Sequence, residues 1–248
     1  MDKLIHTSLS ALRGAMARQA ATANNLANVN TVGFRGEMAA ARPLWLRSSE
    51  GVEARAYAAE EVTGADMRGG TIIETGRDLD VAVQGDALLT VQAENGDEAY
   101  TRRGDLQLSD TGLLTNGDGT PVLGEQGPIT LPPADKVTIE KDGSIFIVPQ
   151  GGDPKQAQLV DRLKLASPVG SDIVKGLDGL FRVRGGGVLP SDPSGKLISG
   201  SIEGSNVEAT KALVDMMEAS RAWETQLKLI NTARDLDGAG ADLMRLPD

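Results

Sequence analysis

Residues 20–35, which read AATANNLANVNTVGFR, decide how this chain folds. The stretch holds four asparagines within seven positions, at Asn24, Asn25, Asn28 and Asn30. Asparagine competes with the backbone for hydrogen bonds and weakens a helix interior. These residues therefore need a reason other than helix propensity.

One hypothesis is that the asparagines set the register of a helix contact. Asn24 and Asn28 are one helical turn apart, so they could hydrogen-bond across such a contact, as a buried polar residue does in a coiled coil. The alternative is that they only fray the helix end in solvent. Gly33 is expected to take a left-handed turn after the helix, and Phe34 is expected to anchor the segment that follows.

A heptad pattern leads into this stretch. Steps of four and three residues connect the positions Ile5, Leu9, Leu12, Met16, Gln19, Ala23 and Leu26. Burying its five large side chains would contribute about 1.5–3 kcal/mol each, against a backbone cost of roughly 1–2 kcal/mol per ordered residue. The pattern predicts a helix that is ordered only against a partner, although an ordinary core helix could carry the same stripe.

A second heptad pattern appears near the end of the chain. Steps of three and four connect Leu213, Met216, Ser220, Trp223, Leu227 and Ile230, and Ser205 or Asn206 is the expected N-cap. Four basic residues and one acidic residue give residues 1–35 a net charge of +3, whereas five basic and eight acidic residues give residues 204–248 a net charge of −3. The two signs favour pairing of the helices.

The region between the helices has the pattern of short strands. Candidate strands at 79–83, 88–91, 106–108, 113–114, 137–139, 144–148, 159–165 and 181–183 are separated by turn signals such as Asn116-Gly117 and Asp142-Gly143. The predicted fold is therefore α+β: two heptad helices paired as an antiparallel hairpin, with a central antiparallel β domain inserted between them. The expected boundaries are a helix at 1–35, an extended connector with short strands at 36–75, the β domain at 76–190, a return connector at 191–203 and a helix at 204–248.

Composition excludes several classes of function. A net charge of −10 argues against a nucleic-acid partner, which needs clustered positive charge. The chain has no cysteine and a single histidine, His6, so thiolate and His-rich metal sites are excluded. Arg13 and Arg18 interrupt the segment that might otherwise form a cleaved signal peptide, and no apolar run has the length of a membrane span.

One short motif resembles part of a catalytic site. Asp110-Thr111-Gly112 matches the Asp-Thr-Gly of aspartic proteases, in which two carboxylates share a proton. The chain has no second copy of the motif, so a hydrolase would need Asp78 or Asp80 as the partner. A turn between Leu108 and Leu113 accounts for the same residues.

Several separated motifs resemble one known family, the axial proteins of the bacterial flagellar rod and hook. Residues 24–35 are similar to its N-terminal signature, residues 75–85 (TGRDLDVAVQG) to its central signature, and residues 203–207 (EGSNV) to the start of its C-terminal helix. Residues 100–104, 112–114 and 121–124 continue the match in the family's order, so the resemblance covers nearly the whole chain. Two departures are Asp86-Ala87-Leu88-Leu89, where the family has Gly and paired aromatics, and Glu208-Ala209-Thr210-Lys211, where it has Asn and paired Glu.

The resemblance implies a structural subunit of the rod that has no catalytic residue, cofactor or metal. Residues 1–5 (MDKLI), the length of the chain and residues 226–233 (QLKLINTA) are most similar to proximal rod proteins, with distal rod or hook proteins as the alternative. Implied partners are other rod proteins, further copies of this chain and the flagellar type III export apparatus, which passes subunits without signal cleavage to the basal body; no membrane insertion is implied. A rival reading, a surface adhesin with a coiled-coil stalk, would require an anchor or secretion signal.

The predicted assembly interface combines both heptad stripes with the residues around the asparagine cluster. Its members are Ile5, Leu9, Leu12, Met16, Asn24, Leu26, Asn28, Phe34, Leu213, Met216, Trp223, Leu227 and Ile230.

Overall fold

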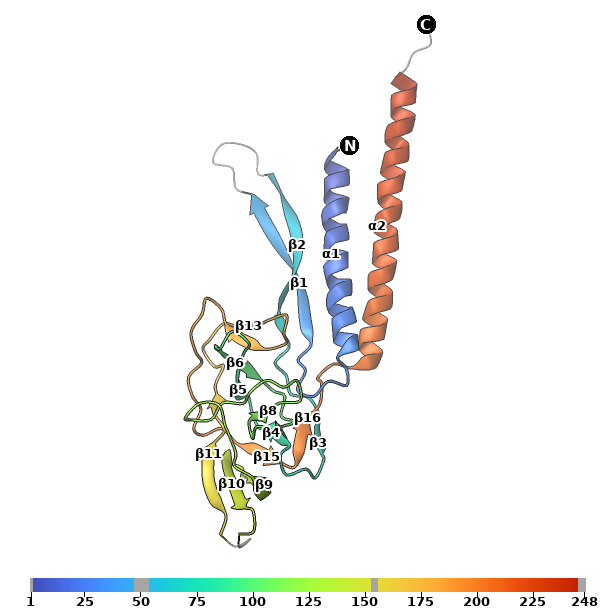
Figure 1. Ribbon diagram of the computed structural model, residues 1–248. Helices are drawn as coiled ribbons and strands as arrows, with labels where there is room; N and C mark the ends of the chain where they lie inside the picture. The colour runs from blue at the N-terminus through green and yellow to red at the C-terminus, as the bar shows by residue number, and fades with distance from the viewer. Residues whose placement is uncertain (1, 47–53, 153–155, 245–248) are drawn as a thin grey trace. The chain divides into compact units, whose positions relative to one another are not determined.

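The fold is α+β, with two helices and several antiparallel sheets (Figure 1). The computed structural model describes residues 2–46, 54–152 and 156–244. The chain forms two compact units. The helical unit contains Met1–Ala27, Glu37–Gly64 and Glu208–Asp248, and the β unit contains Asn28–Gly36 and Ala65–Val207.

The helical unit is built from two long helices and two strands. Helix α1 (Asp2–Ala27) and helix α2 (Ala209–Met244) contact each other, and α1 also contacts strand β1 (Glu37–Leu46). Strand β1 pairs with β2 (Ala54–Ala65). The segment expected to be an extended connector with short strands therefore holds two long ones.

Small residues occupy the buried positions of both helices. Ala15 and Ala21 are buried on α1, and Ala212, Ala219 and Ala233 are buried on α2. The last three are separated by seven and fourteen residues, so they return to nearly the same face of the helix. Alanine lets helix backbones approach closely, but it buries little apolar surface, so this unit gains little from its own packing.

The β unit contains the remaining strands, and their pairings within the described residues are antiparallel. One sheet has the order β12-β5-β6-β14-β13, a second has the order β11-β10-β9, and the strand pairs β15-β4, β16-β3 and β7-β8 complete the unit. The strands are β3 (Ile72–Glu74), β4 (Val81–Val83), β5 (Leu88–Gln92), β6 (Glu98–Thr101), β7 (Gln107–Leu108), β8 (Leu114–Thr115), β9 (Ala134–Ile139), β10 (Ser144–Pro149), β11 (Gln158–Arg162), β12 (Leu165–Ala166), β13 (Ile173–Lys175), β14 (Phe181–Val183), β15 (Leu197–Ser199) and β16 (Ser201–Glu203).

Strand β5 divides its side chains between two apolar clusters of the β unit. Leu89 is fully buried in the larger cluster, which also contains Val91 and Leu106. Leu88 is fully buried in the smaller one beside Tyr100, whose hydroxyl accepts a hydrogen bond from Leu189 N at 2.7 Å. The departure from the family pattern at residues 86–89 thus places leucines in both clusters.

Several turn predictions are confirmed, with one change of position. Gly143 has a φ of 89° between β9 and β10, and Gly33 has a φ of 66°. In the turn after Asn116 the positive φ falls at Gly119, not at Gly117. Asn116 Oδ1 accepts hydrogen bonds from the backbone N–H groups of Asp118 and Thr120, so this side chain closes the turn itself.

The return connector predicted at 191–203 contains two strands. Strand β15 pairs with β4, and β16 pairs with β3, so this segment contributes to the β unit before the chain reaches α2. Their short length and the Gly200 between them hide the alternation that identifies a strand in sequence.

Candidate functional site: the signature junction and the assembly faces

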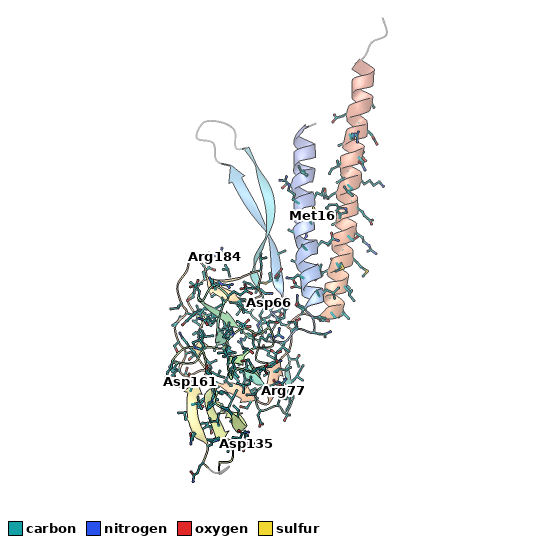
Figure 2. All side chains as sticks on the ribbon, viewed as in Figure 1. Met16, Asp66, Arg77, Asp135, Asp161 and Arg184 are labelled. Carbon is teal, nitrogen blue, oxygen red and sulfur yellow. The ribbon has the colours of Figure 1, made fainter. Side chains whose placement is uncertain are left out.

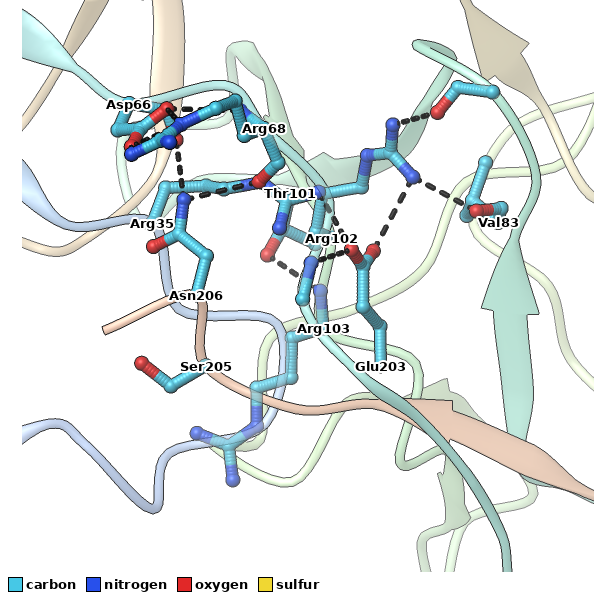
Figure 3. A network of polar contacts seen from close by, with 12 residues as sticks. Arg35, Asp66, Arg68, Val83, Thr101, Arg102, Arg103, Glu203, Ser205 and Asn206 are labelled. Atoms are coloured by element: carbon cyan, nitrogen blue, oxygen red, sulfur yellow. Dashed lines mark hydrogen bonds and ion pairs between the residues drawn. The ribbon is translucent and has the colours of Figure 1, made fainter. Parts of the chain in front are cut away.

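Three charged side chains from distant parts of the sequence meet inside the β unit. The Glu203 carboxylate accepts from Arg35 Nη2 at 2.8 Å and from Arg102 Nη1 at 3.2 Å (Figure 3). The three residues are 1–3% exposed. We call these residues, together with Asn206, the signature junction, because each comes from a motif singled out in the sequence.

Backbone groups complete the surroundings of Glu203. Its Oε1 also accepts from Gly70 N at 2.7 Å, and its carbonyl oxygen accepts from Gly33 N at 2.6 Å. A Cβ atom on Gly33 would lie 2.4 Å from the backbone carbon of Arg102. Glycine is therefore required at this position for its left-handed φ and for the close approach of two backbone segments.

Arg102 binds two carbonyl groups as well as the carboxylate. Its Nη1 donates to Val83 O at 2.8 Å, and its Nη2 donates to Gly85 O. These contacts place the guanidinium at the end of β4, in the central signature. The planar, branched guanidinium can bind several acceptors at once, which a lysine ammonium does with much less directional definition.

Asn206 joins three backbone segments of the β unit. Its Oδ1 accepts from Gly36 N at 2.8 Å, and its Nδ2 donates to Asp66 O at 2.7 Å and to Arg68 O at 3.0 Å. The prediction that Asn206 caps α2 is wrong, because its side chain bonds to these backbone groups instead. Ser205 Oγ accepts from Val207 N, and Glu208 is the residue directly before the helix.

Phe34 is held by a cation from strand β13. Lys175 Nζ lies 3.6 Å from the centroid of the Phe34 ring and donates to Arg35 O at 3.0 Å. A cation over an aromatic face is attracted by the ring quadrupole. The expectation that Phe34 anchors the segment after the asparagine cluster is met by this contact within the β unit.

The junction carries two buried positive charges and one negative charge. Burial lowers the pKa of Arg102, and the Glu203 carboxylate acts in the opposite direction. Arg35 Nε, Arg35 Nη1 and Arg102 Nε have no hydrogen-bond partner in the part of the chain that the structure describes. Because desolvation of such charges is costly, the junction specifies which segments come together more than it adds net stability.

The asparagine cluster makes local contacts in the structure. Asn25 Nδ2 donates to Glu37 O at 2.9 Å, and Glu37 N donates to Asn25 Oδ1 at 2.7 Å, so Asn25 ties the end of α1 to the start of β1. Asn24 Nδ2 donates to Glu37 Oε1 at 2.6 Å. Helix α1 ends at Ala27, so Asn28 lies in the following turn, where it accepts from Thr31 Oγ1.

The predicted assembly residues differ in exposure. Leu9, Met16, Asn24, Leu213 and Leu227 are exposed, while Leu12, Leu26, Asn28, Phe34, Met216, Trp223 and Ile230 are half-buried, and the side chain of Ile5 lies outside the described residues. Figure 2 labels Met16 on α1; its side chain is 52% exposed. Further large apolar side chains on α2 are also exposed, namely Val214, Met217, Leu229 and Leu236.

The Asp110 motif lies in a turn between β7 and β8. Asp110 and Thr111 are exposed, and Gly112 has a φ of 80°. Ser109 Oγ accepts from Leu113 N at 3.1 Å, which closes the turn, and Asp80 is buried and accepts from Thr75 Oγ1 at 2.6 Å. The turn interpretation is confirmed.

Within the described residues, no group of three or more His, Cys, Asp or Glu side chains could hold a metal ion. None of the helices in that part of the chain is both long enough and apolar enough to cross a membrane.

Comparison with known proteins matches the same three parts of the chain. Residues 5–35 match the family described as flagella basal body rod protein, residues 82–147 the flagellar hook protein FlgE/F/G D1 domain, and residues 198–243 the flagellar basal body rod FlgEFG protein C-terminal region. Arg35, Arg102 and Glu203 each lie in a different one of these matches. The three matches indicate the class of axial proteins of the flagellar rod and hook.

Individual relatives agree over the full length. The chain is 39% identical to the flagellar basal-body rod protein FlgF of Salmonella typhimurium over 252 residues, covering 99% of this chain and 100% of the relative. It is also 39% identical to FlgF of Escherichia coli, with the same coverage, and 28% identical to the basal-body rod protein FlgG of Bacillus subtilis, covering 95% and 97%. The chain belongs to the family of flagellar basal-body rod proteins.

The ion triad was not predicted as a site, although all three of its members were quoted in motifs. Heptad positions are easy to recognise by their spacing, whereas single charged residues far apart in the sequence are not. The available signal was that each motif contains a charged residue beside a glycine or a strand end, which is unusual for a purely apolar packing site. Asn25 was likewise passed over in favour of Asn24 and Asn28.

Proposed function

We propose that this chain is a structural subunit of the proximal part of the flagellar rod, which polymerises with further copies and other axial proteins to transmit torque from motor to hook. The observation that carries the proposal is the helical unit of a rod-family chain, which leaves large apolar side chains such as Leu213 and Met217 about half exposed. Surfaces of this kind mark sites of protein association.

The helices are proposed to pair as an antiparallel hairpin whose heptad positions complete their packing in the polymer. The contact between α1 and α2 supports this arrangement, as does the burial of alanines where they pack. Weakly packed helices gain order when they meet equivalent helices on neighbouring subunits, which couples folding to assembly. Repetition of a heterologous contact that does not close gives a helical tube.

The same proposal assigns the chain no enzymatic activity. Its relatives are named as rod proteins, and Asp110 lies in an exposed turn. Export is proposed to use the flagellar type III apparatus without signal cleavage, to a location in the basal body.

A strain that lacks the gene tests the assignment to the proximal rod. Basal bodies from this strain, viewed by electron microscopy, should stop before the distal rod, and the parent gene should restore full rods. Complete rods without hooks would show that the chain acts beyond the rod, as hook proteins do. Complete basal bodies with hooks would overturn the proposal.

A surface variant tests the assembly role of α2. Met217→Glu should leave the isolated subunit folded, because this side chain is 55% exposed, but it should block incorporation into basal bodies. Glu224→Ala, an equally simple change at an exposed position of the same helix, is the matched control. Normal incorporation of Met217→Glu would remove this face from the assembly surface.

A further inference from the structure

Helix α1 carries a seam of exposed side chains on one face. We define the seam as Leu9, Arg13, Met16, Ala20 and Ala23, which follow one another in steps of four and three residues and are all exposed. Such spacing keeps side chains on one face of a helix. The seam is apolar except for Arg13, and its side chains become small toward the end of the helix.

A groove lies on the helical unit between α1, β1 and α2. Its volume is about 530 Å³, and it is lined by Arg18, Ala21, Thr22, Asn25, Glu37, Ala39, Asp215, Glu218, Ala219 and Ala222. Four of these residues are alanines, so a helix could approach the groove closely. The charged lining consists of three carboxylates and one guanidinium, which leaves the groove with negative charge.

Two of the carboxylates are available to a partner. Asp215 and Glu218 are exposed and make no ion pair within the described residues. Arg13 is exposed and also makes none there. A cation on a narrow seam and carboxylates in an alanine-lined groove are complementary in charge and in shape.

The seam and the groove lie on opposite sides of α1. Successive residues of an α-helix are rotated by about 100°, which places Arg18, Thr22 and Asn25 roughly half a turn away from Arg13 and Met16. A surface that binds a different surface of an identical copy makes a heterologous contact, which leaves one seam and one groove open at the ends of each chain of contacts. The contact can therefore repeat.

We propose that the α1 seam of one copy docks in the groove of a second copy, with Arg13 paired to Glu218 and Asp215. This inference rests on the proposed function, because it names the partner of a surface that the assembly role requires. In this contact Arg13 would determine which surface the seam binds, because the other side chains of the seam are small or apolar.

Charge reversal with rescue tests the pairing. In a strain that lacks the chromosomal copy, Arg13→Glu and Glu218→Arg should each reduce the amount of the chain in purified basal bodies by about tenfold, since like charges at an interface cost at least 1.4 kcal/mol. The double variant should recover most of the parent level, and rescue by Asp215→Arg in place of Glu218→Arg counts equally. Asp235→Arg, an exposed reversal of α2 outside the groove, is the control and should assemble normally.

Cross-linking provides a second readout, because the chain contains no cysteine of its own. Arg13→Cys and Glu218→Cys, produced as separate proteins and expressed together, should form a disulfide-linked dimer in basal bodies under mild oxidation. Arg13→Cys expressed together with Asp235→Cys should not.

The outcomes separate this inference from the proposed function. If the parent chain is absent from basal bodies, the proposed function itself fails. If the parent is incorporated but Arg13→Glu is incorporated equally well, or if no reversal in the groove rescues it, the docking of the seam in the groove is overturned while the rod assignment stands. Circular dichroism of each purified variant should show unchanged helix content, since all the altered side chains are exposed.

Discussion

The two units of the molecule bury different kinds of side chain. In the β unit the largest fully buried residues include Tyr100, Leu88, Leu89 and Leu106, together with the charged Arg35. Among the described side chains of the helical unit the buried apolar residues are alanines, while Leu213, Met217 and other large side chains remain exposed. Apolar area removed from water sets the hydrophobic contribution to stability, so most of that contribution comes from the β unit.

This difference indicates that the two units of the chain have different roles. The β unit carries an apolar core and a buried polar junction, which together specify a single folded arrangement. The helical unit leaves large apolar side chains exposed, and the proposed assembly would use this area. We therefore expect that substitutions can change stability and assembly separately. Four substitutions test this separation.

The largest effect is expected from removing the charge of Glu203. Glu203→Gln leaves two buried guanidinium groups without a carboxylate and turns an amide donor toward them, so the free energy of unfolding should fall by about 3–5 kcal/mol. Hydrogen exchange of the β5 and β6 amides measures the change within the β unit. Glu74→Gln, an exposed position on β3, should stay within about 0.5 kcal/mol of the parent. Equal effects of both changes would show that the junction is not a determinant of the fold.

A truncation in the core sharpens the comparison between units. Leu89→Ala should lower the free energy of unfolding by about 2–5 kcal/mol, because it opens a cavity in the larger apolar cluster. Leu213→Ala, at a position 49% exposed on α2, should change the stability of the isolated subunit by about 0.5 kcal/mol or less. Denaturant titration of both purified variants makes the measurement, and comparable losses would contradict the assignment of the core to the β unit.

A smaller effect is expected from closing the space at Gly33. Gly33→Ala combines a left-handed φ of 66° with contact against the Arg102 backbone, and strain of this type costs about 1–3 kcal/mol. Gly85→Ala is the matched control, because Gly85 has a φ of 69° and nothing within 4 Å of an added Cβ. Thermal unfolding of the two variants should differ, and the difference isolates the close approach of the two segments from the φ strain.

The smallest effect concerns pH. Hydrogen bonds from Arg182 hold the pKa of Asp178 below 3.8, so the stabilisation it provides is present above that pH and is lost as pH falls through the lower, folded-state value. Asp178→Asn should therefore lower stability slightly at neutral pH and have no effect well below pH 3.8. Denaturant midpoints at the two pH values test this, and a loss that persists in acid would show another cause. Asp172→Asn, which removes a more exposed partner of Arg184, serves as the comparison.

Much of the fold could be predicted because helices and alternating strands have regular periods. The pattern located α1 and α2 and strands such as β5 and β10. Strands β3, β6, β13, β15 and β16 were missed because three or four residues are too few to show alternation. The pairings of β15 with β4 and of β16 with β3 also join segments more than a hundred positions apart.

The contacts that define the junction could not be read from spacing. Glu203, Arg102 and Arg35 are separated by 101 and 67 positions along the chain, and nothing in the local pattern of any one of them indicates the other two. The heptad stripe could be recognised from its period. The period did not show, however, that the side chains buried on the helices would be alanines. Regular spacing identified the helices, whereas only the folded backbone identified the partners of the charged residues.

The order in which the chain emerges determines when the signature junction can form. Arg35 lies near the start of the sequence and Glu203 near its end, so a chain that emerges from a synthesising or exporting machine with its N-terminus first cannot complete the junction until about four fifths of its length is free. Until then two arginines lack the carboxylate that makes their burial tolerable. The β unit therefore cannot complete this junction until most of the chain has emerged.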